Sequence, residues 1–543
     1  MSLRAWLPKS IETLREGYDS AKFTKDVLAG LTVAIVALPL SMALAIASGA
    51  TPDKGLITAV VAGFLISALG GTRFQIGGPT GAFVVVVFNV IAQHGYDGLL
   101  QATVMAGAIL IVAALARFGA VIRYMPQPVV TGFTSGIALI IFSSQVKDFF
   151  GLAVPKPPAD FIPKWVAYAE NAATLDPATF AVGAGSLVLI LLARRYSPRL
   201  PGFLLAVVAG SAAVAACHLH IETIGSRFGD LPNTLPVPAL PHMEWGRVRE
   251  LFPSAFTIAF LAGIESLLSA VVADSLAGTR HRSNGELLAQ GIANCASALF
   301  GGLPATGAIA RTATNIRSGA YSPVAGMLHA IFLFAFMYFF APLARYIPLA
   351  SLAAVLIVVA WNMSEIERFR HLLRGPRGDG LVLLSTFLLT ALVDLTVAIE
   401  VGIVLACLLF MHRMTQAVEI QSGRHAADAA ALRRDLPKDV ESVHFDGPFF
   451  FGVVSHLTDV LEQIDGSPRA YILDMEDVPM MDASGASALA GFVAHCRKHN
   501  AQVLIAGLRG QPRELARRMG VSDGHDHVRL FATYAEAVAA VKA

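Results

Sequence analysis

Two ionisable residues lie inside long apolar runs of the sequence. Glu265 stands in "TIAFLAGIESLLSAVVA", and Arg311 stands in "AIARTATNIRSGA". An ionisable side chain at membrane depth is costly, so such residues are first read as parts of a substrate or ion pathway. A carboxyl group there can carry a proton, and a guanidinium group can bind an anion. The structural alternative is that Glu265 and Arg311 pair with each other, or that Arg311 only packs near a helix end.

Two similar phrases, "GGPTGAF" and "GGLPATGAI", interrupt apolar sequence far apart in the chain. Each has a Gly pair and a proline, Pro79 or Pro304, shortly before Thr-Gly-Ala, and these residues break helices. Matching breaks in two halves of a membrane protein indicate a transport site. Helices that begin after the breaks, with Thr80 and Thr306 as expected N-caps and ligands, would present positive N-terminal ends to an anion. The alternative is that the Gly and Pro residues merely allow close helix packing.

The first apolar run, "AGLTVAIVALPLSMALAIASG", contains Pro39 and Ser41 near its middle. A proline kinks a transmembrane helix and frees a carbonyl group, which is useful beside a substrate cavity. Ser41 is therefore a further candidate substrate ligand, although an ordinary tolerated proline explains the same pattern. Glu400, close to the end of a later run, is expected to be structural.

The composition requires a membrane protein, because 55% of the 543 residues are hydrophobic and only 15% are charged. Roughly fourteen apolar segments, several of them short, follow one another in residues 27–414, after a cytoplasmic segment 1–26. Arginines in alternate short connections, such as Arg73, Arg280 and Arg317, place both termini in the cytoplasm by the positive-inside rule. Seven segments per half would invert the second half relative to the first and bring both breaks to one midplane site.

The composition changes after Met414. Residues 415–438 are polar and are expected to form a linker. Residues 439–543 alternate between strand and helix patterns, which predicts a small α/β domain. We expect strands near 441–447, 470–475 and 502–508, and helices near 450–464, 484–500, 512–520 and 535–543.

Several function classes are not favoured by the sequence. The net charge of +2 gives no reason to expect a nucleic-acid partner, and no phosphate-binding loop of an ATP-driven pump occurs. The four cysteines are scattered, so neither a disulfide framework nor a metal site is expected. No nucleophile–base constellation suggests an enzyme.

With these motifs in place, the chain resembles the SulP (sulfate permease) family of anion transporters over nearly its whole length. The resemblance lies in "QIGGPTGAF", "GIESLLSAVVAD", "GGLPATGAIARTATNIRSGA" and the C-terminal "MDASG". It implies a seven-plus-seven inverted repeat divided into core and gate, elevator-type alternating access, commonly a homodimer, and a cytoplasmic STAS domain. It places the anion between the third and tenth spans, on Gly78, Thr80, Gly81, Ala82, Ala310 and Arg311.

The family's eighth-span acid matches Glu265, as in members regarded as proton-coupled, so the resemblance implies H⁺ symport, with sodium less expected and no other cofactor. The chain departs from many animal members, which have Pro-Gln-Gly where this chain has Pro39-Leu40-Ser41. Some local phrases look most like a bacterial branch that transports C4-dicarboxylates. Sulfate, bicarbonate and a C4-dicarboxylate such as succinate or fumarate therefore all remain candidates, in a bacterial inner membrane.

In the STAS domain, Ser484 of "DASG" aligns with the phosphorylatable serine of the related anti-sigma-factor antagonists. A helix-capping role is the alternative. A phosphate near a helix N-terminus would be tolerated by the helix dipole, and the domain could bind a cytosolic partner. The competing functions for the whole chain are an uncoupled anion channel or uniporter and a STAS-based sensor.

Overall fold

The structure is a computed structural model of the whole chain. It describes residues 6–120, 125–154, 157–158, 160–196, 200–241, 245–393, 395–416, 419–422, 436–437, 439–451, 468–524 and 527–543. The chain divides into two compact units, Met1–Val404 and Leu405–Ala543. Most of the helix predicted over 450–464 lies outside the described residues.

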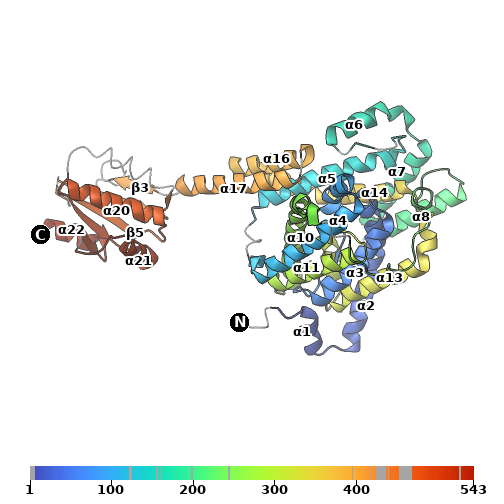
Figure 1. Ribbon diagram of the computed structural model, residues 1–543, viewed down its shortest axis with the longest axis horizontal. Coiled ribbons are helices and arrows are strands. Elements are labelled where there is room, and N and C mark those ends of the chain that lie inside the picture. The colour runs from blue at the N-terminus through green and yellow to red at the C-terminus, as the bar shows by residue number, and fades with distance from the viewer. Residues whose placement is uncertain are drawn as a thin grey trace. The chain divides into compact units, whose positions relative to one another are not determined.

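The first unit is built of helices (Figure 1). In the described part of the chain, nine helices are long and apolar enough to cross a membrane. The helices of the membrane region, in chain order, are α2 (Ser20–Ala47), α3 (Pro52–Leu69), α4 (Phe83–Leu115), α5 (Gln127–Phe150), α7 (Pro177–Tyr196), α8 (Gly202–Ala216), α10 (Val248–Ala277), α11 (Ser283–Leu299), α12 (Ile309–Arg317), α13 (Val324–Ala344), α14 (Leu349–Met363), α16 (Arg377–Leu392) and α17 (Leu395–Gln416). The shorter helices are α1 (Lys9–Arg15), α6 (Phe161–Glu170), α9 (Ile224–Phe228), α15 (Ile366–Leu373) and three 3₁₀ turns, Phe118–Ala120, Ala172–Thr174 and Trp245–Arg247. The predicted helical membrane fold is confirmed.

The third and fourth predicted segments form one element, α4, with a break inside it. Gly95 in "QHGYDG" has φ 71° and ψ 179°, which is not helical. A residue with a side chain rarely adopts this backbone conformation, so glycine is the natural residue for the kink. The two segments are therefore joined by a kink at Gly95 rather than by a longer loop.

The membrane helices pack into two groups. In one group, α4 packs against α10 and α11, and α13 packs against α2 and α3. In the other group, α5 packs against α14 and α16, and α7 packs against α8 and α14. Both Gly-Pro breaks belong to the first group, because they precede α4 and α12. This grouping matches the division into core and gate that the resemblance implies.

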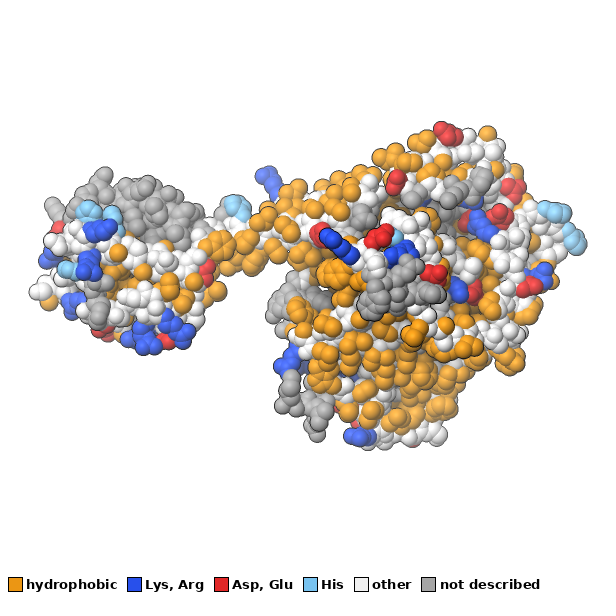
Figure 2. Space-filling view, in the orientation of Figure 1, with side chains coloured by type: hydrophobic (Ala, Val, Ile, Leu, Met, Phe, Trp, Pro, Cys, Tyr) orange, Lys and Arg blue, Asp and Glu red, His pale blue; other side chains and the backbone are white. Residues whose placement is uncertain are grey.

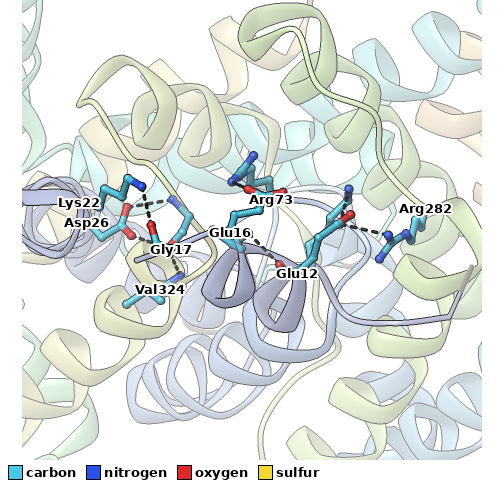
Figure 3. A network of polar contacts seen from close by, with 11 residues as sticks. Glu12, Glu16, Gly17, Lys22, Asp26, Arg73, Arg282 and Val324 are labelled. Atoms are coloured by element: carbon cyan, nitrogen blue, oxygen red, sulfur yellow. Dashed lines mark hydrogen bonds and ion pairs between the residues drawn. The ribbon is translucent and has the colours of Figure 1, made fainter. Parts of the chain in front are cut away.

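Helix α1 is fastened to the first group by polar contacts (Figure 3). The Glu12 carboxylate lies 2.8 Å from Lys9 Nζ and 3.1 Å from Arg282 Nη2, and the Glu16 carboxylate lies 2.5 Å from Arg73 Nη2. Arg282 also donates to the carbonyl of Leu7. Because Arg73 follows α3 and Arg282 precedes α11, α1 links the two halves of the chain.

Much of the surface of the first unit is apolar. Figure 2 shows hydrophobic side chains gathered in broad areas over this unit. Exposed side chains include Val188, Leu191 and Leu192 on α7, and Phe339 and Leu343 on α13. Exposed apolar areas of this extent are expected where lipid, rather than water, surrounds the helices.

The second unit contains a five-stranded sheet in the order β3-β4-β5-β6-β7. Strand β3 (Glu419–Ser422) is antiparallel to β4 (Val440–Asp446), whereas β5 (Ala470–Asp477), β6 (Gln502–Ala506) and β7 (Val528–Phe531) continue in parallel. Helices α20 (Ala483–Lys498), α21 (Gly510–Arg518) and α22 (Tyr534–Lys542) follow the predicted pattern.

Two strands of this unit were not predicted. Strand β3 lies inside the segment expected to be a linker, and β7 lies in a stretch assigned no structure. The sequences "EIQS" and "VRLF" are too short to show a periodicity, so their pairing depends on the neighbouring strands.

Candidate anion site

The two interrupting phrases meet in space. Gly77 and Gly78 form β1, which pairs in antiparallel orientation with β2, formed by Thr306 and Gly307. The register places Gly77 opposite Gly307 and Gly78 opposite Thr306. Where a helix is interrupted at membrane depth, the backbone N–H and C=O groups must find other hydrogen-bond partners. Here the backbone groups of the two breaks pair with each other. The antiparallel pairing is what two inverted halves would produce.

The first break is held against Arg311. The guanidinium Nη2 donates to the carbonyl of Pro79 at 3.0 Å. Gly78 has φ 152°, and a Cβ built there would lie 2.6 Å from Arg311 Nη1. The backbone conformation favours glycine at this position, and a side chain there would also displace the guanidinium.

The second break is held by neighbouring helices. The Asn294 side chain holds both backbone groups of Ala305, the residue after Pro304. Its Nδ2 donates to the Ala305 carbonyl, and its Oδ1 accepts from the Ala305 N–H, at 2.9 Å each. Ser297 Oγ donates to the Leu303 carbonyl, and Thr58 Oγ1 accepts from the Leu303 N–H. These contacts fix where α12 begins.

Glu265 contacts the first break rather than Arg311. Thr80 Oγ1 donates to Glu265 Oε2 at 2.8 Å, and both side chains are half-buried. No ion pair joins Glu265 to Arg311 in the part of the chain that the structure describes. The alternative in which Glu265 and Arg311 form a purely structural ion pair is therefore wrong.

The expected helix caps are wrong. The N-cap residue of α4 is Ala82 and that of α12 is Ala308, and neither makes a side-chain capping bond. Thr80 is committed to Glu265, and Thr306 Oγ1 donates to the Ala262 carbonyl at 2.9 Å. Both hydroxyl groups therefore tie the breaks to α10 instead of closing the helix ends, because the β1–β2 pairing moves the helix starts two residues onward.

The site is accessible on one side and closed on the other. Ala310 is exposed at the start of α12, whereas Arg311 is only 2% exposed and lies behind the first break. Gly81 is packed against the second helix group, since a Cβ there would lie 2.5 Å from Met363 Sδ and 3.1 Å from Ile141 Cδ1. Ala82, the next residue, is buried.

Ser41 lies on α2 and is completely buried, with no partner for its hydroxyl group among the described residues. A free hydroxyl at such depth is compatible with a ligand role. None of the contacts of the described residues places it beside Thr80 or Arg311.

Glu286 and His329 are among the buried polar residues that were not predicted from the sequence. Glu286 on α11 accepts bonds from Thr72, Gln75 and Gln290, which fastens the segment leading to β1. His329 on α13 is completely buried, and neither ring nitrogen has a partner in the described structure. His329 stands in the apolar run "VAGMLHAIFLFAF". It could have been identified in the same way as Glu265, because an ionisable residue inside an apolar run is a functional candidate.

In the second unit, Ser484 does not cap α20. Asp482 is the N-cap, and its carboxylate accepts from the N–H of Gly485 at 2.7 Å. Ser484 is exposed in the first turn of the helix. The capping alternative is therefore wrong for Ser484, because the aspartate two residues earlier already occupies that position.

Paired helix breaks in a multi-helix apolar unit, a carboxylate on one break and a buried guanidinium behind it define a membrane transporter for anions. The chain matches the model of the sulfate permease family over residues 23–386 and that of the STAS domain over residues 436–537. It belongs to the sulfate permease family and carries a C-terminal STAS domain.

Similar proteins agree with this assignment. The chain is 42% identical to the putative sulfate transporter YvdB of Bacillus subtilis, covering 93% of this chain and 95% of that protein. It is 31% identical to the bicarbonate transporter BicA of Picosynechococcus, covering 90% and 89% of the two chains. The structure of the murine anion transporter Slc26a9 in the inward-facing state matches with a TM-score of 0.88 at 19% identity, covering 99% of this chain and 94% of the other, and shows a shared fold.

Proposed function

We propose that this protein is a proton-coupled symporter of a small anion, with the anion held at the β1–β2 pair. The candidate anions are sulfate, bicarbonate and C4-dicarboxylates such as succinate or fumarate. The names of the two relatives support the first two anions. The phrases "LPLSMALAIASG", "AIARTATNIRSGA" and "AWNMSE", which look like a C4-dicarboxylate-transporting branch, support the third.

The anion would lie beside the breaks and would reach Gly81 and Ala82, which are buried in this structure, from the side of half-buried Thr80 and exposed Ala310. The first turns of α4 and α12 begin there, and a helix N-terminus favours an anion through its positive dipole end. In α4 the Phe83 and Val84 N–H groups already donate to the carbonyls of Thr80 and Gly81, so the dipole rather than these donors would act on the anion. Arg311 would add positive charge from behind the first break, through the peptide of Pro79. Its Nη1 is buried without a partner in the described residues, which fits a site built to hold extra negative charge.

The Thr80–Glu265 hydrogen bond is the single observation that carries the coupling. While Glu265 is ionised, it repels an anion and occupies the Thr80 hydroxyl proton. Protonation of Glu265 removes the charge and frees that donor for the anion. The proton and the anion therefore favour each other's binding, which is the thermodynamic requirement for symport.

Transport would proceed by elevator-type movement of the first helix group against the second. The contact of Gly81 with Met363 and Ile141 is the surface that must slide. We further propose a homodimer in a bacterial inner membrane, with both termini and the STAS domain in the cytoplasm, where a cytosolic partner or phosphorylation of Ser484 could act.

The test is uptake by the purified full-length protein in liposomes, with and without an inward proton gradient. Labelled sulfate, bicarbonate, succinate and fumarate are compared, and sodium replaces the proton gradient in a parallel series. We expect one anion to accumulate only when the proton gradient is present. If the anions only equilibrate whatever the gradient, the protein is a channel or uniporter and the coupling proposal is wrong.

A further inference from the structure

The buried side of Arg311 contains a second polar group without a partner. The Arg311 guanidinium has one satisfied nitrogen, Nη2, and one unsatisfied nitrogen, Nη1. His329 is 0% exposed, and both of its ring nitrogens lack a partner in the described residues. Each unpartnered buried polar group is destabilising, so both groups call for a physical reason.

The packing of α13 places His329 toward the first break. One turn before His329, a Cβ at Gly326 would lie 3.2 Å from Ile76 Cδ1, the residue before β1. One turn after it, Leu333 packs in a cluster with Ala59 of α3. Ala59 Cα in turn lies 3.6 Å from the Cβ position of Gly78, beside Arg311 Nη1.

The backbone of α13 comes close to α2 at the same level. A Cβ at Gly30 would lie 2.6 Å from the Ala325 carbonyl oxygen and 3.1 Å from the backbone nitrogen of His329. The backbone at His329 therefore lies against α2, while the residues one turn before and after it pack toward the β1 segment and α3. A polar ring at a fully buried position is better explained by a polar neighbour than by packing, which an apolar residue would perform at lower cost.

We propose that His329 is a positioning residue for Arg311. A neutral imidazole offers one acceptor nitrogen, which complements the unsatisfied Nη1 donor. It holds the guanidinium against the Pro79 carbonyl, so that the positive charge stays directly behind the anion. This inference rests on the proposed function, because the held charge matters only if an anion binds at the breaks.

The test compares His329→Leu and His329→Gln in the full-length protein. Liposome uptake at a fixed proton gradient gives KM and maximal rate for the anion that the wild type accumulates, and thermal unfolding in detergent reports stability. We expect His329→Leu to raise KM about tenfold or more, the effect of losing one hydrogen bond to a charged group. The maximal rate and unfolding temperature should change little. His329→Gln, which keeps an acceptor, should restore KM to within about threefold.

Met337→Leu, a buried substitution two turns further along α13, is the matched control for repacking and should leave KM unchanged. If the Leu variant does not give a monodisperse protein, His329→Asn replaces it, because its shorter amide cannot reach the same place. If KM is unchanged in His329→Leu, or in His329→Asn where that variant replaces it, the inference is overturned and His329 has only a packing role. If the wild type itself takes up none of the anions, the proposed function fails instead, and the two failures are distinct.

Discussion

At the residue scale, the central feature is the hydrogen bond that the Thr80 hydroxyl group donates to the Glu265 carboxylate at the first break. Thr80 cannot donate to Glu265 and to an anion at the same time with its single proton. Under the proposed function, occupancy of the site by an anion therefore depends on the protonation state of Glu265. Arg311 donates to the Pro79 carbonyl from behind the break and would contribute affinity but not coupling.

Glu265→Gln is expected to uncouple transport. The amide keeps the size of the carboxyl group and can still accept from Thr80, but it takes up no proton. Exchange of labelled for unlabelled anion across liposomes should persist, whereas accumulation driven by the proton gradient should fall to the level of protein-free liposomes. In the wild type, KM for the anion should rise as pH increases, and in the variant it should be independent of pH.

Glu400→Gln provides the matched control, because Glu400 is an exposed glutamate on another membrane helix, α17. It should retain both accumulation and the pH dependence. Gradient-driven accumulation by Glu265→Gln would show that another group carries the proton.

At the element scale, α1 acts as a clamp across the two halves of the first helix group. Its acidic residues, Glu12 and Glu16, face arginines that follow α3 and precede α11 (Figure 3). The hydrogen bond from Lys9, together with the charges of Lys9, Arg282 and Arg73, lowers the pKa of Glu12. Docking of α1 is therefore favoured by the ionised form of Glu12.

The sign of the pH dependence follows from this direction. Because folding lowers the pKa of Glu12, its contribution is complete above the ordinary value of 4.5 and is lost as pH falls through the lowered value. Hydrogen exchange of residues 9–15, corrected for the intrinsic rate, should accelerate in that acidic range. At neutral pH, Glu12→Gln should already accelerate exchange there by about two- to fivefold, the effect of exposed ion pairs.

Glu170→Gln, an exposed substitution on α6, should leave the exchange of α1 unchanged. If Glu12→Gln also leaves α1 protected at neutral pH, the backbone contacts of α1, such as Lys9 N–H to the Gly70 carbonyl, hold it without the ion pairs.

At the scale of the whole molecule, the predicted orientation can be tested with the chain's own cysteines. Cys217 is exposed in the connection after α8, which the charge pattern assigns to the outer side. Cys496 lies in the STAS domain, which the same pattern assigns to the cytoplasm. It is 1% exposed, and its burial raises the pKa of the thiol to about 12.

A membrane-impermeant maleimide should label Cys217 on intact cells, and Cys217→Ser should abolish this labelling. Cys496 should stay unlabelled even in opened membranes at neutral pH and react once the STAS domain is denatured, since thiolate is the reactive form. Labelling of Cys217 only after the membrane is opened would reverse the orientation.

The sequence by itself determined the apolar segments, the α/β pattern of the second unit and the two phrases that interrupt helices. These features are local: runs of apolar residues exclude water, and Pro and Gly break helices wherever they stand. Glu265 and Arg311 were found for the same reason, since a charge in an apolar run is visible without a fold.

Only the tertiary structure decided what these residues contact. The pairing of Gly77 with Gly307, the bond from Thr80 to Glu265 and the burial of Arg311 behind Pro79 join residues far apart in the chain. No local pattern encodes such contacts, because they depend on how α3, α10 and α13 pack around the breaks. The same packing leaves the ring nitrogens of His329 and Nη1 of Arg311 buried without partners among the described residues, which a list of motifs does not reveal.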